Sequence, residues 1–126
     1  MKQLLIVEDA ENLTRLLALV LGAAGFEVEC VAEAGRAAER LALDPLPHAL
    51  LCDQNLEDST GVALLSELRA DVRTRALPTA VMSARLDEAE RAAIAALDAL
   101  ALDKPLDMAQ LPVELMKLIA ARGEAA

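Results

Sequence analysis

Four short apolar segments of this chain are each followed by polar or charged residues, and this pattern restricts the possible folds more than any other feature. The segments cover 3–7, 48–52, 79–82 and 99–102, and after them come Glu8-Asp9, Asp53, Ser83 and Lys104-Pro105. Short continuous apolar runs are typical of strands that are covered on both faces of a parallel sheet. The carboxyl ends of such strands meet at one edge, where ligands bind. We therefore expect these polar residues to share one site.

Helix-like segments separate the apolar runs, so strand and helix patterns alternate along the chain. Apolar residues recur at helical spacing over 13–24, and further helices are expected over 34–43, 62–71, 87–97 and from about 112 onward. A weaker alternating segment, 27–31, predicts a strand at the sheet edge. The alternation predicts an α/β fold, namely a doubly wound (βα)5, flavodoxin-like sandwich with a five-stranded parallel sheet in the order 2-1-3-4-5.

The start of the last helix contains a local conflict. Asp107 and Gln110 resemble a capping box, which would place Pro112 in the second helical turn. There, proline removes a backbone hydrogen bond and disfavours helix at Leu111. Proline is tolerated at the first helical position. We therefore expect the regular helix to start near Pro112.

Length and composition narrow the class of protein. The 126 residues fit a single domain, 1–126, without an effector domain. The formal net charge of −9 and the absence of a basic stripe argue against nucleic-acid binding. No apolar run approaches the roughly 20 residues that span a bilayer, and Glu8 and Asp9 interrupt the N-terminal run too early for a signal peptide. We expect a cytoplasmic protein without membrane contact.

The two cysteines, Cys30 and Cys52, match no zinc-binding pattern. Both fall in segments that we expect to be inner strands, where a reduced cysteine acts as a small apolar residue. In the order 2-1-3-4-5 the first strand separates them by about 9–10 Å, which exceeds the roughly 7 Å that a disulfide spans. We expect no disulfide.

The polar residues at the strand ends have the composition of a magnesium-dependent phosphoryl site. Mg²⁺ prefers hard oxygen ligands and keeps some of its waters. Asp9 and Asp53 are candidate direct ligands, and Glu8 is a candidate to hold a metal-bound water. The backbone carbonyl of Asn55 would complete the protein's share, and Mn²⁺ would suit the same oxygen ligands.

Asp53 is the candidate nucleophile of this site, since a carboxylate oxygen can form a covalent phosphoryl intermediate. Phosphoryl transfer needs mainly positioning and neutralisation of charge, which Lys104 and the Ser83 hydroxyl would supply. Each residue alone has an ordinary explanation, because acidic residues after a strand often serve the next helix terminus. Their joint order at successive strand ends favours the functional interpretation.

This constellation resembles the receiver domain of bacterial two-component response regulators, over nearly the whole chain. The matching segments are Leu4-Leu5-Ile6-Val7-Glu8-Asp9, Leu50-Leu51-Cys52-Asp53, Gly61, Val81-Met82-Ser83-Ala84 and Lys104-Pro105. The resemblance implies that Asp53 accepts a phosphoryl group from a sensor histidine kinase or a phosphotransfer protein, with Mg²⁺ as cofactor. It also implies that Ser83 and Lys104 bind the phosphoryl group and that Asn55 and Arg85 tune its hydrolysis. Such a domain catalyses only its own phosphorylation and dephosphorylation and is not otherwise an enzyme.

Three departures from the family pattern predict an altered output. Glu57 stands where the family usually has proline, and Leu97-Asp98-Ala99 stands where a Gly-Ala pair commonly precedes the fifth strand. Ala101 aligns with the tyrosine or phenylalanine that usually swings inward on activation. The phosphorylation chemistry is therefore expected, but the usual coupling of hydroxyl to aromatic ring is not.

These observations favour a stand-alone receiver, a monomer or weak homodimer that signals through contacts with a downstream protein. The alternative is a receiver-like interaction module that works without phosphorylation, which the missing aromatic favours. A phosphatase of the haloacid-dehalogenase type is disfavoured because Asn55 occupies the position of its second acid. A flavodoxin is weaker still, since the chain lacks aromatic residues to stack on a flavin.

Overall fold

The computed structural model describes the backbone of residues 1–125 and the side chains of residues 1–122, and strands and helices alternate throughout. The strands are β1 (Lys2–Val7), β2 (Phe26–Val31), β3 (Ala49–Asp53), β4 (Thr79–Ser83) and β5 (Leu100–Asp103). The helices are α1 (Glu11–Ala23), α2 (Ala34–Leu41), α3 (Gly61–Ala70), α4 (Glu88–Ala96) and α5 (Leu111–Ala125). None of the helices in this described part is both long and apolar enough to cross a membrane.

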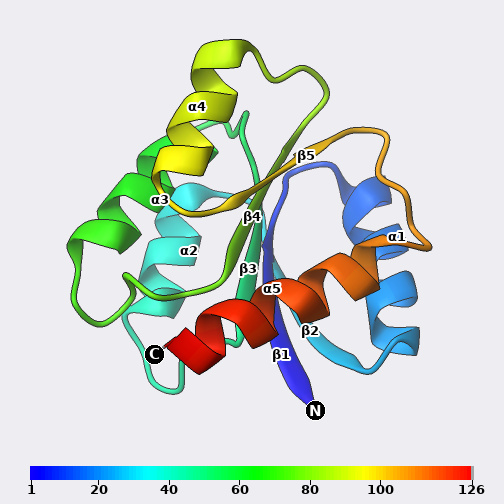
Figure 1. The fold of residues 1–126 in the computed structure, drawn as a ribbon. Helices are drawn as coiled ribbons and strands as arrows, with labels where there is room; N and C mark the ends of the chain where they lie inside the picture. Colours follow the sequence, from blue (N-terminus) through cyan, green and yellow to red (C-terminus); the bar gives the residue numbers. More distant parts are fainter. Residues whose placement is uncertain (126) are drawn as a thin grey trace.

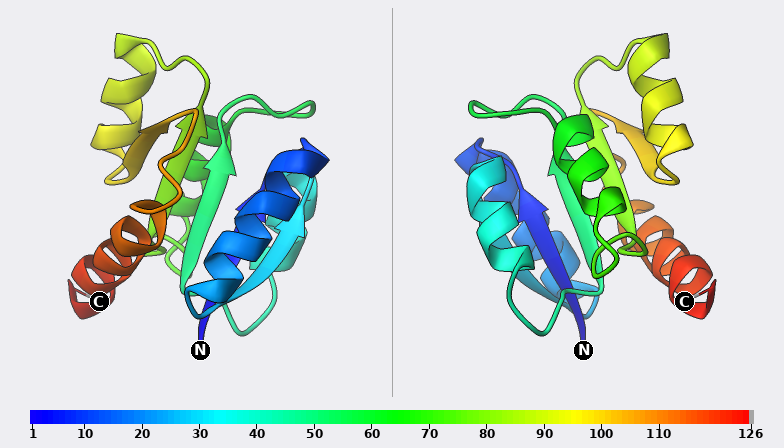
Figure 2. Two further views of the ribbon diagram at one scale, coloured as in Figure 1. Left: turned by 90° about the vertical axis from the view of Figure 1, so that its right-hand side faces the viewer. Right: turned by 90° about the vertical axis from the view of Figure 1, so that its left-hand side faces the viewer.

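The strands form one parallel sheet in the order β2-β1-β3-β4-β5. Helices α2, α3 and α4 cover one face of the sheet, and α1 and α5 cover the other (Figures 1 and 2). This confirms the doubly wound fold and the strand order expected from the sequence. Because each strand returns through a helix, all carboxyl ends lie at the same edge of the sheet.

Burial along the strands explains why the central runs are apolar throughout. Every residue of β3 and β4 is buried, whereas β2 and β5, at the two edges, keep exposed or half-buried positions. Leu51 belongs to the core cluster beneath α1 and α5, which includes Leu21 and Leu115. Its neighbour Leu50 points to the other face and packs in the cluster that includes Leu64 of α3. Alternate side chains thus bury both sides of one strand.

Several element ends differ from the sequence predictions by one or two residues. β3 and β4 include Asp53 and Ser83 themselves, because parallel pairing aligns Asp53 with Met82 and Ser83 with Asp103. Helix α2 ends at Leu41 rather than at 43. The chain has to leave the helix before Pro45, since proline disfavours helical geometry in the residue that precedes it.

Helix α5 begins at Leu111, one residue before Pro112. The preceding turn is held by Asp107, whose carboxylate accepts the N–H groups of Ala109 and Gln110 at 3.0 and 3.1 Å. The late start is confirmed to within one residue. Proline therefore lies in the first turn, where its missing N–H costs no helical hydrogen bond.

The two cysteines differ in environment. Cys52 is buried in β3, but Cys30 is exposed, so the expectation of two buried cysteines in inner strands is wrong for Cys30. The reason is topological, because β2 lies at the edge of the sheet, which is the position that its weaker alternating pattern predicts. Both are free thiols, as expected. Burial, with the nearby Asp53 carboxylate, raises the pKa of Cys52 to about 12, so that this thiol stays protonated at neutral pH.

Candidate functional site

Three carboxylates meet at the carboxyl edge of the sheet. Glu8 and Asp9 directly follow β1, and Asp53 is the last residue of the neighbouring strand β3. One carboxylate oxygen of each residue lies within 4.8 Å of the others. Glu8 and Asp53 are 3% and 5% exposed, whereas Asp9 is open to solvent. The cluster is therefore accessible from the side of Asp9.

Lys104 neutralises part of this negative charge. Its side chain extends from the loop after β5, and its Nζ lies 2.6 Å from Glu8 Oε1 and 3.4 Å from Asp53 Oδ1. Burial by itself lowers the pKa of Lys104, but the hydrogen bond to Glu8 and the charges of both carboxylates outweigh it and raise that pKa. The Lys104 side chain therefore stays positively charged at neutral pH.

The phosphoacceptor candidate, Asp53, is under opposing influences. Burial raises the pKa of its carboxyl, and the charge of Glu8 adds to the rise. Lys104 and a hydrogen bond from the backbone N–H of Asn55 act in the opposite direction. Like charges at close range disfavour full ionisation unless a cation is added. The three carboxylates thus carry more negative charge than Lys104 neutralises.

Ser83, the last residue of β4, is fully buried and already has partners. Its Oγ accepts a hydrogen bond from Asn55 Nδ2 at 3.1 Å and one from the backbone N–H of Arg85 at 3.3 Å. The backbone N–H of Lys104 donates to the Ser83 carbonyl at 2.8 Å, which joins the two strand ends. Arg85 touches the site through its backbone, and no side-chain hydrogen bond of Arg85 is found among the described residues.

The donor set fits a magnesium ion. Carboxylate oxygens are hard ligands of the kind that Mg²⁺ selects, and the exposed side of the cluster leaves room for the waters that it retains. The side-chain Nδ2 of Asn55 donates to Ser83, and the backbone carbonyl of Asn55 remains the predicted additional ligand. The structure therefore brings together the sequence-predicted residues Glu8, Asp9, Asp53, Ser83 and Lys104.

Two residues of the loop after β3 have contacts that the sequence did not reveal. Asp58 caps α2: its carboxylate oxygens accept the N–H groups of Ala34 and Gly35 at 2.9 and 2.8 Å. Gln54, immediately after Asp53, is a buried polar residue that bonds to α3 and α4. The acidic run in this loop and a polar residue at a strand end are weak signals. Neither identifies a partner more than twenty residues away.

Comparisons with known proteins agree with this geometry. The family model of the response regulator receiver domain matches residues 4–116. The chain is 38% identical over 86 residues to the phosphate regulon transcriptional regulatory protein PhoB of Rhizobium meliloti. The aligned residues are 68% of this chain and 37% of that protein. The curated relatives that it matches are longer, and the matched parts are 23–52% of their lengths.

Solved structures show the same fold. A sensor protein from Polaromonas sp. JS666 is 36% identical, with a TM-score of 0.87 over 96% of this chain and 98% of that chain. The receiver domain of sensor histidine kinase PA1611 from Pseudomonas aeruginosa PAO1, solved with a magnesium ion in its active-site cleft, is 23% identical. Its TM-score is 0.83, over 94% of this chain and 98% of that one.

The parallel (βα)5 sandwich and the acidic edge of its sheet define a signalling domain of two-component systems, and the chain belongs to the response regulator receiver domain family. Domains of this family bind Mg²⁺ at an acidic site and interact with histidine kinases or phosphotransfer proteins. They are signalling domains rather than conventional enzymes. The resemblance identified from the sequence motifs is confirmed at the level of the family.

Proposed function

We propose that this domain is a phosphorylation-controlled signalling module in which Asp53 is the phosphoacceptor. The observation that supports this most directly is the cluster of three carboxylates within 4.8 Å of one another, with one ammonium group contacting two of them. Lys104 offsets only part of the repulsion among Glu8, Asp9 and Asp53. A divalent cation would remove the remainder, and a phosphoryl group would then be attracted to the same place.

Magnesium would be held by Asp9 and Asp53 directly, by Glu8 through a water, and by the backbone carbonyl of Asn55. When bound, the ion neutralises charge on the phosphoryl oxygens and orients them. Manganese suits the same oxygens. The magnesium in the Pseudomonas receiver supports this assignment only through the shared fold.

The chemical step uses residues of this chain in distinct roles. A carboxylate oxygen of Asp53 attacks the phosphorus of a phosphohistidine or an acyl phosphate, and the bond from phosphorus to the donor breaks. The leaving imidazole or carboxylate takes the electron pair. Lys104 would then bind one phosphoryl oxygen, and the Ser83 hydroxyl would donate to another after releasing the Asn55 amide. Water attack on phosphorus later restores the Asp53 carboxylate.

Asn55 and Arg85 lie at the edge of the site and would tune this hydrolysis. Asn55 donates to Ser83, and Arg85 follows Ser83 by two residues, so both would border the path of an attacking water. The phosphoryl donor would be a sensor histidine kinase or a phosphotransfer protein. The receiver would signal through a downstream protein, as a monomer or weak homodimer.

The output would leave by an unusual route. Ala101, on β5, stands where the family usually carries a tyrosine or phenylalanine, and it packs against a cluster that contains Leu86 and Ile94. A methyl group has no ring to swing inward. The phosphorylated state would therefore reach the surface without the usual aromatic switch.

Intact-mass measurement tests the phosphoacceptor. The protein is incubated with Mg²⁺ and acetyl phosphate, and we expect one phosphoryl adduct in the wild type and in the Glu57→Gln control. Glu57 lies in the same loop but outside the carboxylate cluster. Asp53→Asn should remove the adduct. A wild type without an adduct, or an adduct that survives Asp53→Asn, would contradict the proposal.

A second candidate function is a phosphorylation-independent interaction module, and Ala101 is the observation that favours it. In that case the site would bind ligands without altering the surface. Amide spectra recorded with and without Mg²⁺ and beryllofluoride, a mimic of the phosphoryl group, separate the two functions. Changes confined to the loops of the site would favour the interaction module, whereas changes that reach α4 and β5 favour the switch.

A further inference from the structure

Gln54 directly follows the phosphoacceptor, and its side chain has two partners on two different helices. It is 5% exposed. Its Oε1 accepts the backbone N–H of Val62 at the start of α3, at 2.9 Å, and its Nε2 donates to Glu90 Oε2 in α4 at 3.0 Å. Its backbone is fixed as well, because its N–H donates to Met82 and its carbonyl accepts from Gly61. Gln54 therefore has one defined orientation.

Glu90 uses its two carboxylate oxygens for two different purposes. Oε1 accepts the backbone N–H of Asp87 at 3.0 Å, while the Asp87 carboxylate accepts the N–H of Glu90 at 2.7 Å. This reciprocal pair is the capping box of α4. Oε2 accepts from Gln54. The same carboxylate thus caps α4 and ties its first turn to the residue after Asp53.

Helix α4 has one further polar attachment along its length, the ion pair of Arg91 with Asp103 at the end of β5. Ile94 is the one buried residue of α4, whereas Ala92, Ala95 and Ala96 are exposed. Because apolar burial is the main source of attachment for a surface helix, a helix with one buried residue depends on its polar contacts for its position.

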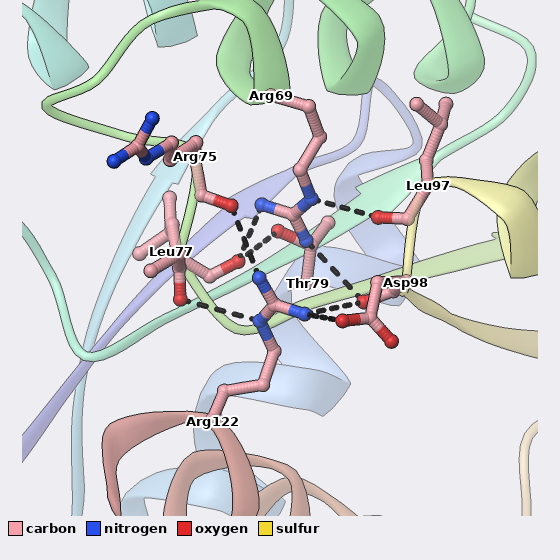
Figure 3. Close-up of polar contacts among 8 residues, drawn as sticks. Arg69, Arg75, Leu77, Thr79, Leu97, Asp98 and Arg122 are labelled. Carbon is pink, nitrogen blue, oxygen red and sulfur yellow. Dashed lines mark hydrogen bonds and ion pairs between the residues drawn. The ribbon is translucent and has the colours of Figure 1, made fainter. Parts of the chain in front are cut away.

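The far end of α4 is fixed by an arginine pair, which Figure 3 shows. Arg69 of α3 donates to the carbonyl of Leu97 at 2.7 Å and to that of Leu77 at 2.9 Å. Arg122 of α5 donates to the carbonyl of Asp98 at 3.1 Å and pairs with the Asp98 carboxylate. Burial, with the neighbouring Arg122, lowers the pKa of Arg69 to about 10, so the Arg69 guanidinium stays charged at neutral pH. These bonds fix the carboxyl end of α4 to α3 and α5.

The two ends of α4 therefore differ in how they are connected to Asp53. The arginine pair joins residues that are remote in sequence from Asp53. The first turn of α4, in contrast, is connected to the surroundings of Asp53 in two ways. Gln54 follows Asp53 directly, and a three-residue loop, 84–86, joins Ser83 to the Asp87 cap. A phosphoryl group on Asp53 would carry about −1.5 to −2 charges in place of the single charge of the carboxylate, and it would recruit the Ser83 hydroxyl. It would pull that loop while Gln54 stays bound to α3.

We propose that the Gln54–Glu90 hydrogen bond transmits the state of Asp53 to the first turn of α4, while the arginine pair holds the other end. This inference rests on the proposed phosphorylation of Asp53. In the unphosphorylated protein the bond fixes the first turn of α4 relative to β3. Displacement of the 84–86 loop changes the alignment of Glu90 with Gln54, and the amino end of α4 moves. The route needs no aromatic residue at Ala101.

Exchanging the two side chains tests this connection. Glu90→Gln keeps an oxygen for the Asp87 N–H but places an amide donor opposite the Gln54 amide donor, so it breaks only the link. Gln54→Glu in the same protein restores one donor and one acceptor and keeps the total charge of the pair. Glu88→Gln, in the same helical turn, serves as the control, since no hydrogen bond of its side chain is found among the described residues.

The readouts are intact mass after Mg²⁺ and acetyl phosphate, and hydrogen exchange of the α4 amides with and without Mg²⁺ and beryllofluoride. In the wild type and in Glu88→Gln, we expect the exchange rates in the first turn of α4 to differ by about threefold to tenfold between the free and the beryllofluoride-bound protein. A change of this size corresponds to a modest coupling energy between contacting residues. Glu90→Gln should keep the phosphoryl adduct and lose this difference. The double exchange, Gln54→Glu with Glu90→Gln, should recover it.

An adduct together with an unchanged α4 response in Glu90→Gln would overturn the inference and leave the proposed function intact. Failure of the folded double variant to recover the response would also overturn it. If the double variant does not fold, Gln54→Met, which removes the donor from the other side, has to reproduce the loss seen in Glu90→Gln. No adduct on the wild type would overturn the proposed function and this inference together.

Discussion

At the scale of single residues, Gly61 shows how closely the backbone approaches itself around Asp53, the proposed phosphoacceptor. A β-carbon at this position would lie 2.9 Å from the Asp53 carbonyl oxygen, 3.0 Å from Val81 Cγ1 and 3.2 Å from Gln54 Cα. Two of these atoms are backbone and cannot yield without displacing Asp53. Gly61→Ala should therefore lower the free energy of unfolding by about 1–3 kcal/mol, the usual cost of overpacking. Urea denaturation measures it.

Gly22 provides the matched control. It lies in α1, and a β-carbon there would meet no atom within 4 Å. Gly22→Ala should stabilise the protein by about 0.5–1 kcal/mol, because alanine loses less backbone entropy in a helix. If Gly61→Ala were as stable as Gly22→Ala, the close approach at Asp53 would not exist.

The sequence predicted which residues gather at the site but not how they pair. Asp53, Ser83 and Asn55 are all found there, since strand ends and the loops that follow them are set by the topology. That the Asn55 amide binds the Ser83 hydroxyl depends on side-chain rotamers, which no spacing rule encodes. The hydrogen bond of the buried Gln54 amide could not be predicted either, because its partner Glu90 is 36 residues away in the sequence.

At the scale of elements, helix α2 depends on a cap from outside its own segment. The residue at its N-cap position, Glu33, makes no side-chain capping bond, and Asp58 from the loop after β3 supplies both acceptors. The N–H groups of Gly35 and Ala34 lower the pKa of the Asp58 carboxyl below its ordinary value of 3.8. Folding thus stabilises the ionised form of the Asp58 carboxyl relative to the unfolded chain.

The sign of the pH dependence follows from this. A lowered pKa in the folded state gives stability that is fully present above the ordinary value of 3.8 and is lost as the pH falls through the folded-state pKa. Asp58→Ala should be less stable than the wild type at neutral pH, and the gap should narrow below that value. Urea midpoints recorded from neutral pH to about pH 3 measure the gap, in the range where linkage to this carboxyl acts.

Glu57→Gln is the appropriate comparison, since Glu57 is the adjacent exposed acid in the same loop. It should remain close to the wild type in stability over the whole range. A constant difference between Asp58→Ala and the wild type at every pH would contradict the capping role. In that case the lost stability would come from packing rather than from the charged cap.

Helices were predictable from the sequence as segments, but their ends were less so. The period of apolar residues identified α1 through α5, because burial of one face sets that pattern. The end of α2 was placed two residues too late, since the pattern continues through Leu43 although the chain turns toward Pro45. The cap of α2 was missed because Asp58 lies 24 residues from Ala34.

At the scale of the whole molecule, the topology followed from few rules. Alternating strands and helices, parallel pairing and helical crossovers restrict the sheet to a small set of orders, and the observed order is the expected one. The arginine pair that joins α3, α4 and α5 lay beyond such rules. Arg69 and Arg122 donate to backbone carbonyls, which are present at every residue and carry no sequence signal.

A divalent cation bound at the carboxylate cluster would stabilise the whole fold. Glu8 and Asp9 stand more than forty residues from Asp53, so the cluster exists only in the folded protein. A cation that binds only the folded state stabilises it by about 2.7 kcal/mol at 100 times its dissociation constant. Thermal unfolding should therefore shift to higher temperature as Mg²⁺ is added. Asp9→Asn should remove most of the shift, because it takes one carboxylate from the exposed side of the site.

The control for this shift is Glu11→Gln, which changes an exposed acid just outside the cluster and should keep the full response. Potassium chloride at the same ionic strength separates specific binding from simple screening of the net charge of −9. Excess chelator should return the wild type to its original midpoint. If Asp9→Asn kept the whole magnesium shift, the ion would bind elsewhere, and the assignment of Glu8, Asp9 and Asp53 as its ligands would be wrong.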